Sequence, residues 1–183
     1  LASNPLSLFF IWEGGLSFHG GLMGVIVSLY IYSYQHRISF LRLADAICMA
    51  MPIGLGLVRI GNFLNGELYG RPTDGTWGFI FPTDPYGFTR HPSQLYEAFF
   101  EGFFLFILLI FISTKTNKHG VISGSFLIAY GLIRFLIEYF RQPDSHMGFV
   151  ALQLSMGQLL SIPMVIIGFI LLTKSLRRNE AIS

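Results

Sequence analysis

Five long stretches of this chain contain almost no charged side chain. A helix needs about 20 apolar residues to cross the hydrocarbon core of a bilayer, and only helices or closed barrels satisfy every backbone hydrogen bond there. The stretches lack the two-residue alternation of a barrel strand. The sequence therefore predicts an all-α, polytopic membrane helix bundle that forms a single membrane domain over residues 1–183. The expected helices cover residues 15–34, 43–63, 95–113, 121–139 and 151–173.

Composition supports lipid as the solvent of this chain. Only 12% of the 183 residues are charged and 52% are hydrophobic, whereas soluble domains carry about 25% charged residues. The net charge of +2 is spread along the chain, which excludes the basic stripe of a nucleic-acid-binding protein. Cys48 is the only cysteine, so we expect no internal disulfide and interpret it as a packing residue.

The loops between the stretches alternate in charge. Basic residues follow the first, third and fifth expected helices, for example Arg37, Lys118 and Arg177. By the positive-inside rule these ends face the cytoplasm, so residues 64–92 are expected on the outer side of the membrane. That segment is rich in Gly, Pro, Asp and Thr, which is typical of loops, and a short strand is expected at residues 77–81.

Ionisable side chains inside the fourth stretch fall on one helical face. Each costs about 2.5–3.5 kcal/mol on insertion scales and therefore usually faces a cavity or a partner. Arg134 and Glu138 are four residues apart and are predicted to pair. The pair either belongs to a binding site or only stabilises the bundle. The polar residues of this face are Tyr130, Arg134, Glu138 and Arg141.

The third stretch carries Gln94, Glu97 and Glu101 within a narrow arc of its helix. We interpret the carboxylates as counterions for arginines of neighbouring helices. The end of the second stretch, residues 59–71, combines three glycines with Asn, Glu and Arg. This composition suits backbone that approaches a polar ligand, and it equally suits a helix C-cap followed by a turn.

Arg59 and Arg134 are both expected in the outer half of the membrane, where phospholipid head groups lie. A guanidinium group matches the oxygens of a phosphate, and the interaction strengthens away from water. Asn62, Asn65 and Glu67 are candidates to hold a polyol. These residues predict a lipid-head-group site that opens toward the outer leaflet.

Several blocks of the sequence resemble the prolipoprotein diacylglyceryl transferase family, in the family's order and over nearly the whole chain. Val58 departs from the pattern, because the family usually has Gly there. The resemblance implies a protein of seven helices, so two N-terminal helices are expected to be missing from this chain. The blocks are Ser17–Gly21, Arg59–Arg71, His91–Glu97, Tyr130–Gly131 with Arg134 and Glu138, Phe140–Asp144, and Ser155–Gln158.

The resemblance implies a reaction in the bacterial inner membrane, with the active site toward the periplasm. The diacylglyceryl group of phosphatidylglycerol moves to the lipobox cysteine thiol of a prolipoprotein, a thioether forms and glycerol phosphate leaves. No metal or other cofactor is implied. Catalytic roles fall on His19, as the base for the thiol, and on Arg59 and Arg134, at the phosphate.

The resemblance also assigns substrate contacts and supporting roles. Substrate contacts fall on Arg59, Asn62, Glu67, Gly70, Tyr130 and Arg134. Supporting roles fall on Asn65, His91, Gln94, Glu97, Glu138 and Arg141. Read from the residues alone, His19 beside Gly20 and Gly21 is either a packing residue or a group that takes a proton near neutral pH.

Two other classes of membrane protein are compatible with buried arginines. In a lipid or anion transporter they would line a permeation path. The polar residues cluster toward one side of the membrane and the chain shows no internal repeat, which disfavours this alternative. A purely structural bundle partner is disfavoured by the cost of burying so many charges.

Overall fold

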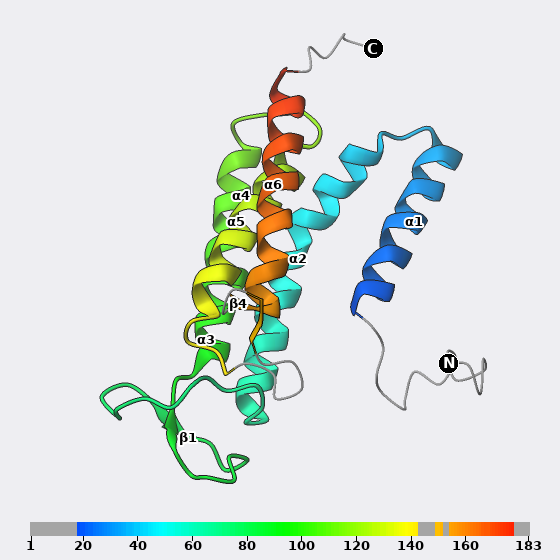
Figure 1. The fold of residues 1–183 in the computed structure, drawn as a ribbon. Helices are drawn as coiled ribbons and strands as arrows, with labels where there is room; N and C mark the ends of the chain where they lie inside the picture. Colours follow the sequence, from blue (N-terminus) through cyan, green and yellow to red (C-terminus); the bar gives the residue numbers. More distant parts are fainter. Residues whose placement is uncertain (1–17, 143–148, 152–153, 178–183) are drawn as a thin grey trace, which may run out of the picture. The chain divides into compact units, whose positions relative to one another are not determined.

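The computed structural model describes residues 18–142, 149–151 and 154–177, and these residues are mainly helical (Figure 1). The chain divides into two compact units, Leu1–Leu43 and Ala44–Ser183. Among the described residues, three helices are long and apolar enough to cross a membrane: Phe40–Leu64, Ser93–Ser113 and Met156–Arg177. A further apolar helix, Val121–Ile137, is shorter. The predicted fold class, an all-α membrane helix bundle, is confirmed.

The first unit contains helix α1, Phe18–His36, and the start of helix α2, Phe40–Leu64. α1 ends where Arg37 adopts a φ of 56° and the Ile38 N–H donates to the Ser33 carbonyl at 3.1 Å. This is the left-handed ending of a Schellman motif. Glycine usually occupies that position because a Cβ is unfavourable there.

The second unit is built from the rest of α2 and three further helical segments. α3, Ser93–Glu97, continues through the π-helix η3, Ala98–Phe104, into α4, Leu105–Ser113. α5 covers Val121–Ile137 and α6 covers Met156–Arg177. α5 packs against both α4 and α6, and the three run alongside one another in Figure 1.

The core of the second unit lies between α4 and α5. Leu105, Leu109 and Phe126 are buried there, and Cys48 packs against them as expected. Many other large apolar side chains are exposed, Phe169 among them. Such exposure is expected where lipid surrounds the helices, because lipid tails are as apolar as the side chains themselves.

Small residues allow α5 and α6 to approach closely. A Cβ added to Gly124 would lie 2.9 Å from the backbone nitrogen of Leu172, and one added to Gly168 would lie 2.8 Å from the Gly124 carbonyl oxygen. Further along, a Cβ at Gly131 would lie 3.1 Å from the Ser161 carbonyl oxygen. Small residues at such positions let transmembrane helices pack backbone to backbone.

The start of α5 is capped by a side chain from α2. Asp45 accepts hydrogen bonds from the backbone N–H groups of Gly120 at 2.7 Å and Ser123 at 2.8 Å, and from the Ser123 hydroxyl. A carboxylate at a helix N-terminus satisfies free N–H groups and interacts favourably with the helix dipole. Sequence reasoning missed Asp45, because 75 residues separate it from Gly120.

The second unit has basic residues at one end and a long loop at the other. The basic end carries Lys115 and Lys118 after α4 and Lys174 and Arg177 in α6, and the Lys118 ammonium donates to a carbonyl near the end of α6 at 2.6 Å. At the opposite end in Figure 1, which we call the loop end, lies the segment between α2 and α3. There β1, Phe79–Ile80, pairs with β2, Thr89–Arg90, in antiparallel register.

The last helix begins later than expected. Residues 151–155 were expected in the helix, but β3, Phe149–Ala151, pairs with β4, Leu154–Ser155, and α6 begins at Met156. A capping box fixes this start: the Ser155 N–H donates to Gln158 Oε1 at 3.1 Å, and the Gln158 N–H donates to Ser155 Oγ at 3.2 Å. The Ser-x-x-Gln spacing is the sequence signal that marks it.

Candidate active site

The two arginines predicted for a phosphate site share one carboxylate. Glu97 Oε2 lies 2.7 Å from Arg59 Nε and 3.0 Å from Arg134 Nη1. Arg134 also reaches Glu138 Oε2 through Nη2 at 2.9 Å. The predicted Arg134–Glu138 pair is therefore present, and Glu97 is a counterion as expected. This cluster joins α2, α3 and α5, and the Glu97 side chain is fully buried.

The two guanidinium groups differ in the number of carboxylates that they contact. Arg134 contacts three carboxylates, those of Glu97, Glu138 and, at 3.7 Å, Glu101. Arg59 meets Glu97 through Nε, and its two terminal nitrogens make no hydrogen bond to any residue that the structure describes. The Arg59 side chain is also the more exposed, at 16% against 10%. Arg59 is therefore the arginine with donors available to a ligand.

Glu101 belongs to the same cluster and lies in the π-helix η3. It is fully buried, and neither of its oxygens has a hydrogen-bond partner in the described part of the chain. Beside it, a Cβ at Gly102 would lie 2.8 Å from the Gly56 Cα. This close approach brings α2 near enough for Arg59, less than one turn beyond Gly56, to reach Glu97. π-helical turns are rare and occur frequently at functional sites.

Acceptor oxygens without partners gather around the cluster. Buried polar atoms are nearly always hydrogen-bonded in native proteins, so each exception needs an explanation. On Asn62 and Gln94 and on the three glutamates of the cluster these atoms are acceptors, which suits a ligand that donates hydrogen bonds, such as a hydroxyl-bearing one. Within the described residues, these acceptors are Asn62 Oδ1, Gln94 Oε1, Glu97 Oε1, Glu138 Oε2 and both carboxylate oxygens of Glu101.

The turn after α2 has the C-cap geometry that the sequence left open. Gly66 adopts a φ of 68°, its N–H donates to Phe63, and the Glu67 N–H donates to the Asn62 carbonyl at 2.8 Å. This is a Schellman motif. The Asn65 amide donates to Glu67 Oε1 at 2.9 Å, and both side chains are exposed. The C-cap interpretation is thus correct, and it leaves Asn65 and Glu67 accessible.

α3 holds this turn in place through a fully buried side chain. The Gln94 amide nitrogen donates to the Glu67 carbonyl at 2.6 Å, and Ser93 Oγ donates to the Leu68 carbonyl at 3.3 Å. Leu68 has a φ of 53°, which is uncommon outside glycine. Gln94 thus fixes the backbone that presents the Glu67 side chain.

Gly70 lies where three backbone segments meet. Its N–H donates to the His91 carbonyl at 2.9 Å, and the Arg71 N–H donates to the Phe140 carbonyl at 2.9 Å. A Cβ at Gly70 would lie 2.5 Å from the Phe140 oxygen and 2.7 Å from the His91 oxygen. Glycine is therefore required for backbone packing. Arg141 lies beside this junction, where its carbonyl accepts from Arg71 Nε at 2.9 Å.

An ion pair in the loop was not singled out by sequence reasoning. Arg90 Nε and Nη2 donate to the two oxygens of Asp84 at 2.7 and 3.1 Å, and the guanidinium stacks over the Tyr69 ring at 4.7 Å. Asp84 also accepts from the N–H groups of Tyr86 and Phe88. The Arg90 guanidinium, above all, holds the pKa of Asp84 below its ordinary value. This ion pair ties the loop together.

Three further residues predicted for the site are Tyr130, His91 and His19. Tyr130 stacks on Phe126 at 5.6 Å between ring centroids, on the same helix as Arg134. The His91 ring nitrogen lies 3.3 Å from the Tyr96 hydroxyl. The side chain of His19 lies outside the described part of the structure. Among the described residues, no three His, Cys, Asp or Glu side chains come together as a metal site requires.

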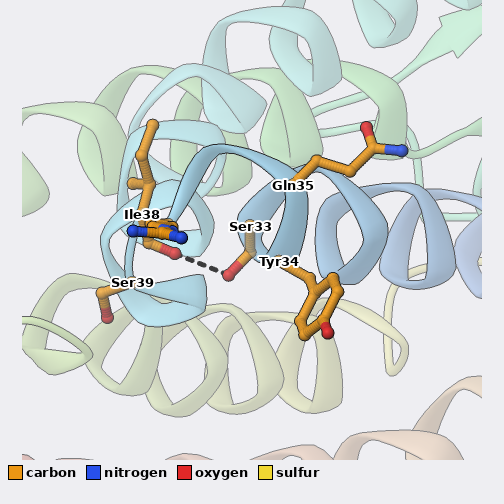
Figure 2. A pocket seen from close by; sticks show the side chains of 6 residues that line it. Ser33, Tyr34, Gln35, Ile38 and Ser39 are labelled. Carbon is orange, nitrogen blue, oxygen red and sulfur yellow. Dashed lines mark hydrogen bonds between the residues drawn. The ribbon is translucent and has the colours of Figure 1, made fainter.

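A separate pocket of about 650 Å³ lies at the turn between α1 and α2, within the first unit (Figure 2). Figure 2 shows the Ser33 hydroxyl directed at the Ile38 carbonyl, to which it donates at 2.6 Å. The pocket contains none of the predicted functional residues. Its lining is Ser33, Tyr34, Gln35, Arg37, Ile38 and Ser39.

Comparison with known proteins points to one family. The sequence model described as "Prolipoprotein diacylglyceryl transferase" matches residues 1–174. Proteins named phosphatidylglycerol–prolipoprotein diacylglyceryl transferase are similar to the chain. That of Bordetella parapertussis is 51% identical over 166 residues, which cover 91% of this chain and 63% of the relative. That of Photobacterium profundum is 52% identical over 169 residues, 92% of this chain and 63% of the relative. That of Geobacter sulfurreducens is 52% identical over 177 residues, 97% of this chain and 68% of the relative. The chain thus spans a little under two thirds of the first two relatives.

Proposed function

The chain belongs to the prolipoprotein diacylglyceryl transferase family, and on this premise we propose that it transfers the diacylglyceryl group of phosphatidylglycerol to a prolipoprotein cysteine. The thiol sulfur bonds to the glyceryl carbon, and the carbon–oxygen bond to the phosphate breaks. The electron pair of that bond goes to the departing glycerol phosphate. The product is a thioether, and the protein acts in the bacterial inner membrane with its loop end toward the periplasm.

The observation that carries this proposal is the Arg59 guanidinium, which contacts Glu97 through Nε and leaves its two terminal nitrogens available. Negative charge develops on the leaving phosphate in the transition state, so a fixed cation with free donors stabilises it most where water is excluded. Arg59 is held through Nε by the buried Glu97, which leaves its terminal nitrogens for phosphate oxygens. Arg134 adds a second positive charge at the same oxygen, since its Nη1 lies 3.0 Å from Glu97 Oε2.

The hydroxyl groups of the head-group glycerol match the buried acceptor oxygens that lack a hydrogen-bond partner. Its hydroxyls are donors, and the buried oxygens of Asn62 and Gln94 have no partner among the described residues. Glu67, presented by the turn after α2, adds an accessible carboxylate. Support therefore comes from two kinds of group beside each other, donors for the phosphate and acceptors for the polyol.

The thiol proton is assigned to His19 on the basis of its sequence block. A cysteine thiol with an ordinary pKa of about 8.5 is already a few per cent thiolate near neutral pH, so a weak base is sufficient. Tyr130, Gly70 and the remaining supporting residues orient the arginines and the loop. The lipobox segment of a prolipoprotein is the second substrate.

The test is a transfer assay in nanodiscs that contain phosphatidylglycerol with a labelled diacylglyceryl group. A lipobox peptide is added, and the thioether product is measured by mass spectrometry. Arg59→Ala is expected to lower the rate at least about 100-fold, the cost of one preorganised donor to a developing oxyanion. Arg59→Lys should recover only part of the rate, because it keeps the charge and loses the planar fork.

Lys115→Ala, at the basic end, is the matched control and should keep wild-type activity. Activity of Arg59→Ala within a few-fold of the control would remove Arg59 from the phosphate site. In sealed vesicles that contain the protein, labelled lipid that moves between the leaflets without any covalent product would support the transporter alternative and reject the proposed reaction.

A further inference from the structure

The loop between α2 and α3 exposes many of its large apolar side chains and buries the ion pair of Asp84 and Arg90. Trp77, Ile80 and Tyr86 are 64%, 68% and 72% exposed. Between Pro72 and Thr89 the only charged residues are Asp74, which is exposed, and Asp84, which is buried. A loop in water normally shows the opposite arrangement, with polar side chains outside. We call this the loop apolar surface; its exposed members are Leu64, Trp77, Phe79, Ile80, Tyr86 and Phe88.

Contacts within the loop hold Asp84 and Arg90 in its interior. Asp84 is occupied by Arg90 and by the N–H groups of Tyr86 and Phe88. Arg90 in turn lies over the Tyr69 ring. Because Asp84 draws the backbone of residues 86 and 88 inward, the side chains of these residues are left on the outside. The Tyr86 and Phe88 rings stack there, with centroids 5.7 Å apart.

The loop apolar surface continues directly into α2. The Phe63 ring, in the last turn of α2, lies 5.4 Å from Phe79 and 5.9 Å from Phe81. A pocket of about 240 Å³ opens between the end of α2 and β1, with Leu64 and Ile80 among its lining residues. Along α2, the exposed residues Leu57, Ile60 and Leu64 form the apolar side of a helix fit to cross the membrane.

We propose that the loop apolar surface rests in the outer leaflet of the bilayer, at the boundary between head groups and acyl chains. The loop apolar surface is continuous with the exposed apolar side of α2. Because α2 is long and apolar enough to cross the membrane, its end lies at the membrane boundary, and lipid is the partner expected there. Trp, Tyr and Phe are the side chains that prefer this boundary. The loop then acts as an anchor that holds the turn at Gly66–Glu67 against the lipid from which substrate is drawn.

The test uses tryptophan fluorescence in vesicles, which does not depend on transfer activity. Trp12→Phe leaves Trp77 as the only tryptophan of the chain. Lipids brominated near the top of the acyl chains quench tryptophan from within the bilayer, and iodide quenches it from water. Trp77 is expected to be quenched by the brominated lipids and protected from iodide.

Two matched proteins, each without Trp12 and Trp77, set the scale. Leu57→Trp reports a lipid-facing position on α2, and Lys115→Trp reports the aqueous basic end. Trp77 should behave like Leu57→Trp. Adding Ile80→Asp to the Trp77 protein should weaken quenching by lipid and increase quenching by iodide, while leaving the fold intact because this side chain is exposed.

Iodide quenching of Trp77 equal to that of Lys115→Trp, without quenching by lipid, would overturn the proposal. Protection of Trp77 that develops only when a lipobox peptide is added would also overturn it, and would make the surface a peptide dock. Because quenching is read without turnover, an inactive protein with a lipid-quenched Trp77 would refute the proposed reaction and leave the anchor standing.

Discussion

Glu97 is the residue on which the candidate site depends most, since its carboxylate contacts both Arg59 of α2 and Arg134 of α5. Removing it leaves Arg59 and Arg134 without their shared counterion in a buried environment. Breaking a buried ion pair from one side costs about 3–5 kcal/mol, and we expect Glu97→Ala to fall in this range. The 16% exposure of Arg59 allows that side chain some solvent and favours the lower end.

Glu97→Gln removes the negative charge and keeps the shape of the side chain, so it separates the two contributions. The amide oxygen can still accept from one arginine, so the loss should be that of a hydrogen bond to a charged group, about 1.5–3 kcal/mol. Unfolding in mixed micelles by titration with SDS measures both variants. Glu67→Gln is the matched control, because its carboxylate is exposed and, among the described residues, pairs only with the Asn65 amide. It should change the free energy of unfolding by about 0–1 kcal/mol.

A double-mutant cycle isolates the shared contact. Glu97→Gln combined with Arg134→Gln should be less destabilised than the sum of the single variants, with an interaction energy of about 0.5–3 kcal/mol. Additive effects would show that the 3.0 Å contact carries no net free energy. If Glu97→Ala proved as stable as the Glu67→Gln control, the view of Glu97 as the tie between α2 and α5 would be refuted.

Three further outcomes follow from the fold. Asp45→Ala should lower stability by about 1–2 kcal/mol through loss of the cap on α5, measured by the same SDS titration; wild-type stability would mean that water replaces the carboxylate at the Gly120 N–H. Gly70→Ala should cost about 1–3 kcal/mol or more, because rigid backbone surrounds the position, and an unchanged unfolding curve would show that the junction can open. For Asp84, Arg90 lowers the folded pKa, so the stabilisation is fully present above about pH 4, the ordinary range of an Asp carboxyl, and is lost as pH falls through the lower folded value. An NMR titration of the Asp84 carboxyl should show this low midpoint in wild type and a higher one in Arg90→Gln; equal midpoints would contradict the assignment.

Local signals were enough for much of the fold. Long apolar runs can form only helices in lipid, so four of the expected helices appear near their expected bounds, with α1 described from Phe18 onward. The glycine-containing end of α2 predicted a C-cap as one of two alternatives, and Gly66 forms it. The spacing of Arg134 and Glu138 predicted their pair, because residues four apart meet on any helix. Each of these features depends on neighbours within one or two turns.

Contacts between distant segments were decided only by the tertiary structure. No local pattern shows that Glu97 contacts both arginines while the buried Glu101 lies 3.7 Å from Arg134. These distances depend on the π-helical turn and on the close approach of Gly56 to Gly102. The cap from Asp45 to α5 depends on how α2 packs. The Asp84–Arg90 pair depends on the path of a whole loop. The chain's chemistry follows from which residues it carries, but the partner of each charge is fixed by the rotation and spacing of packed helices, which are properties of the assembled bundle.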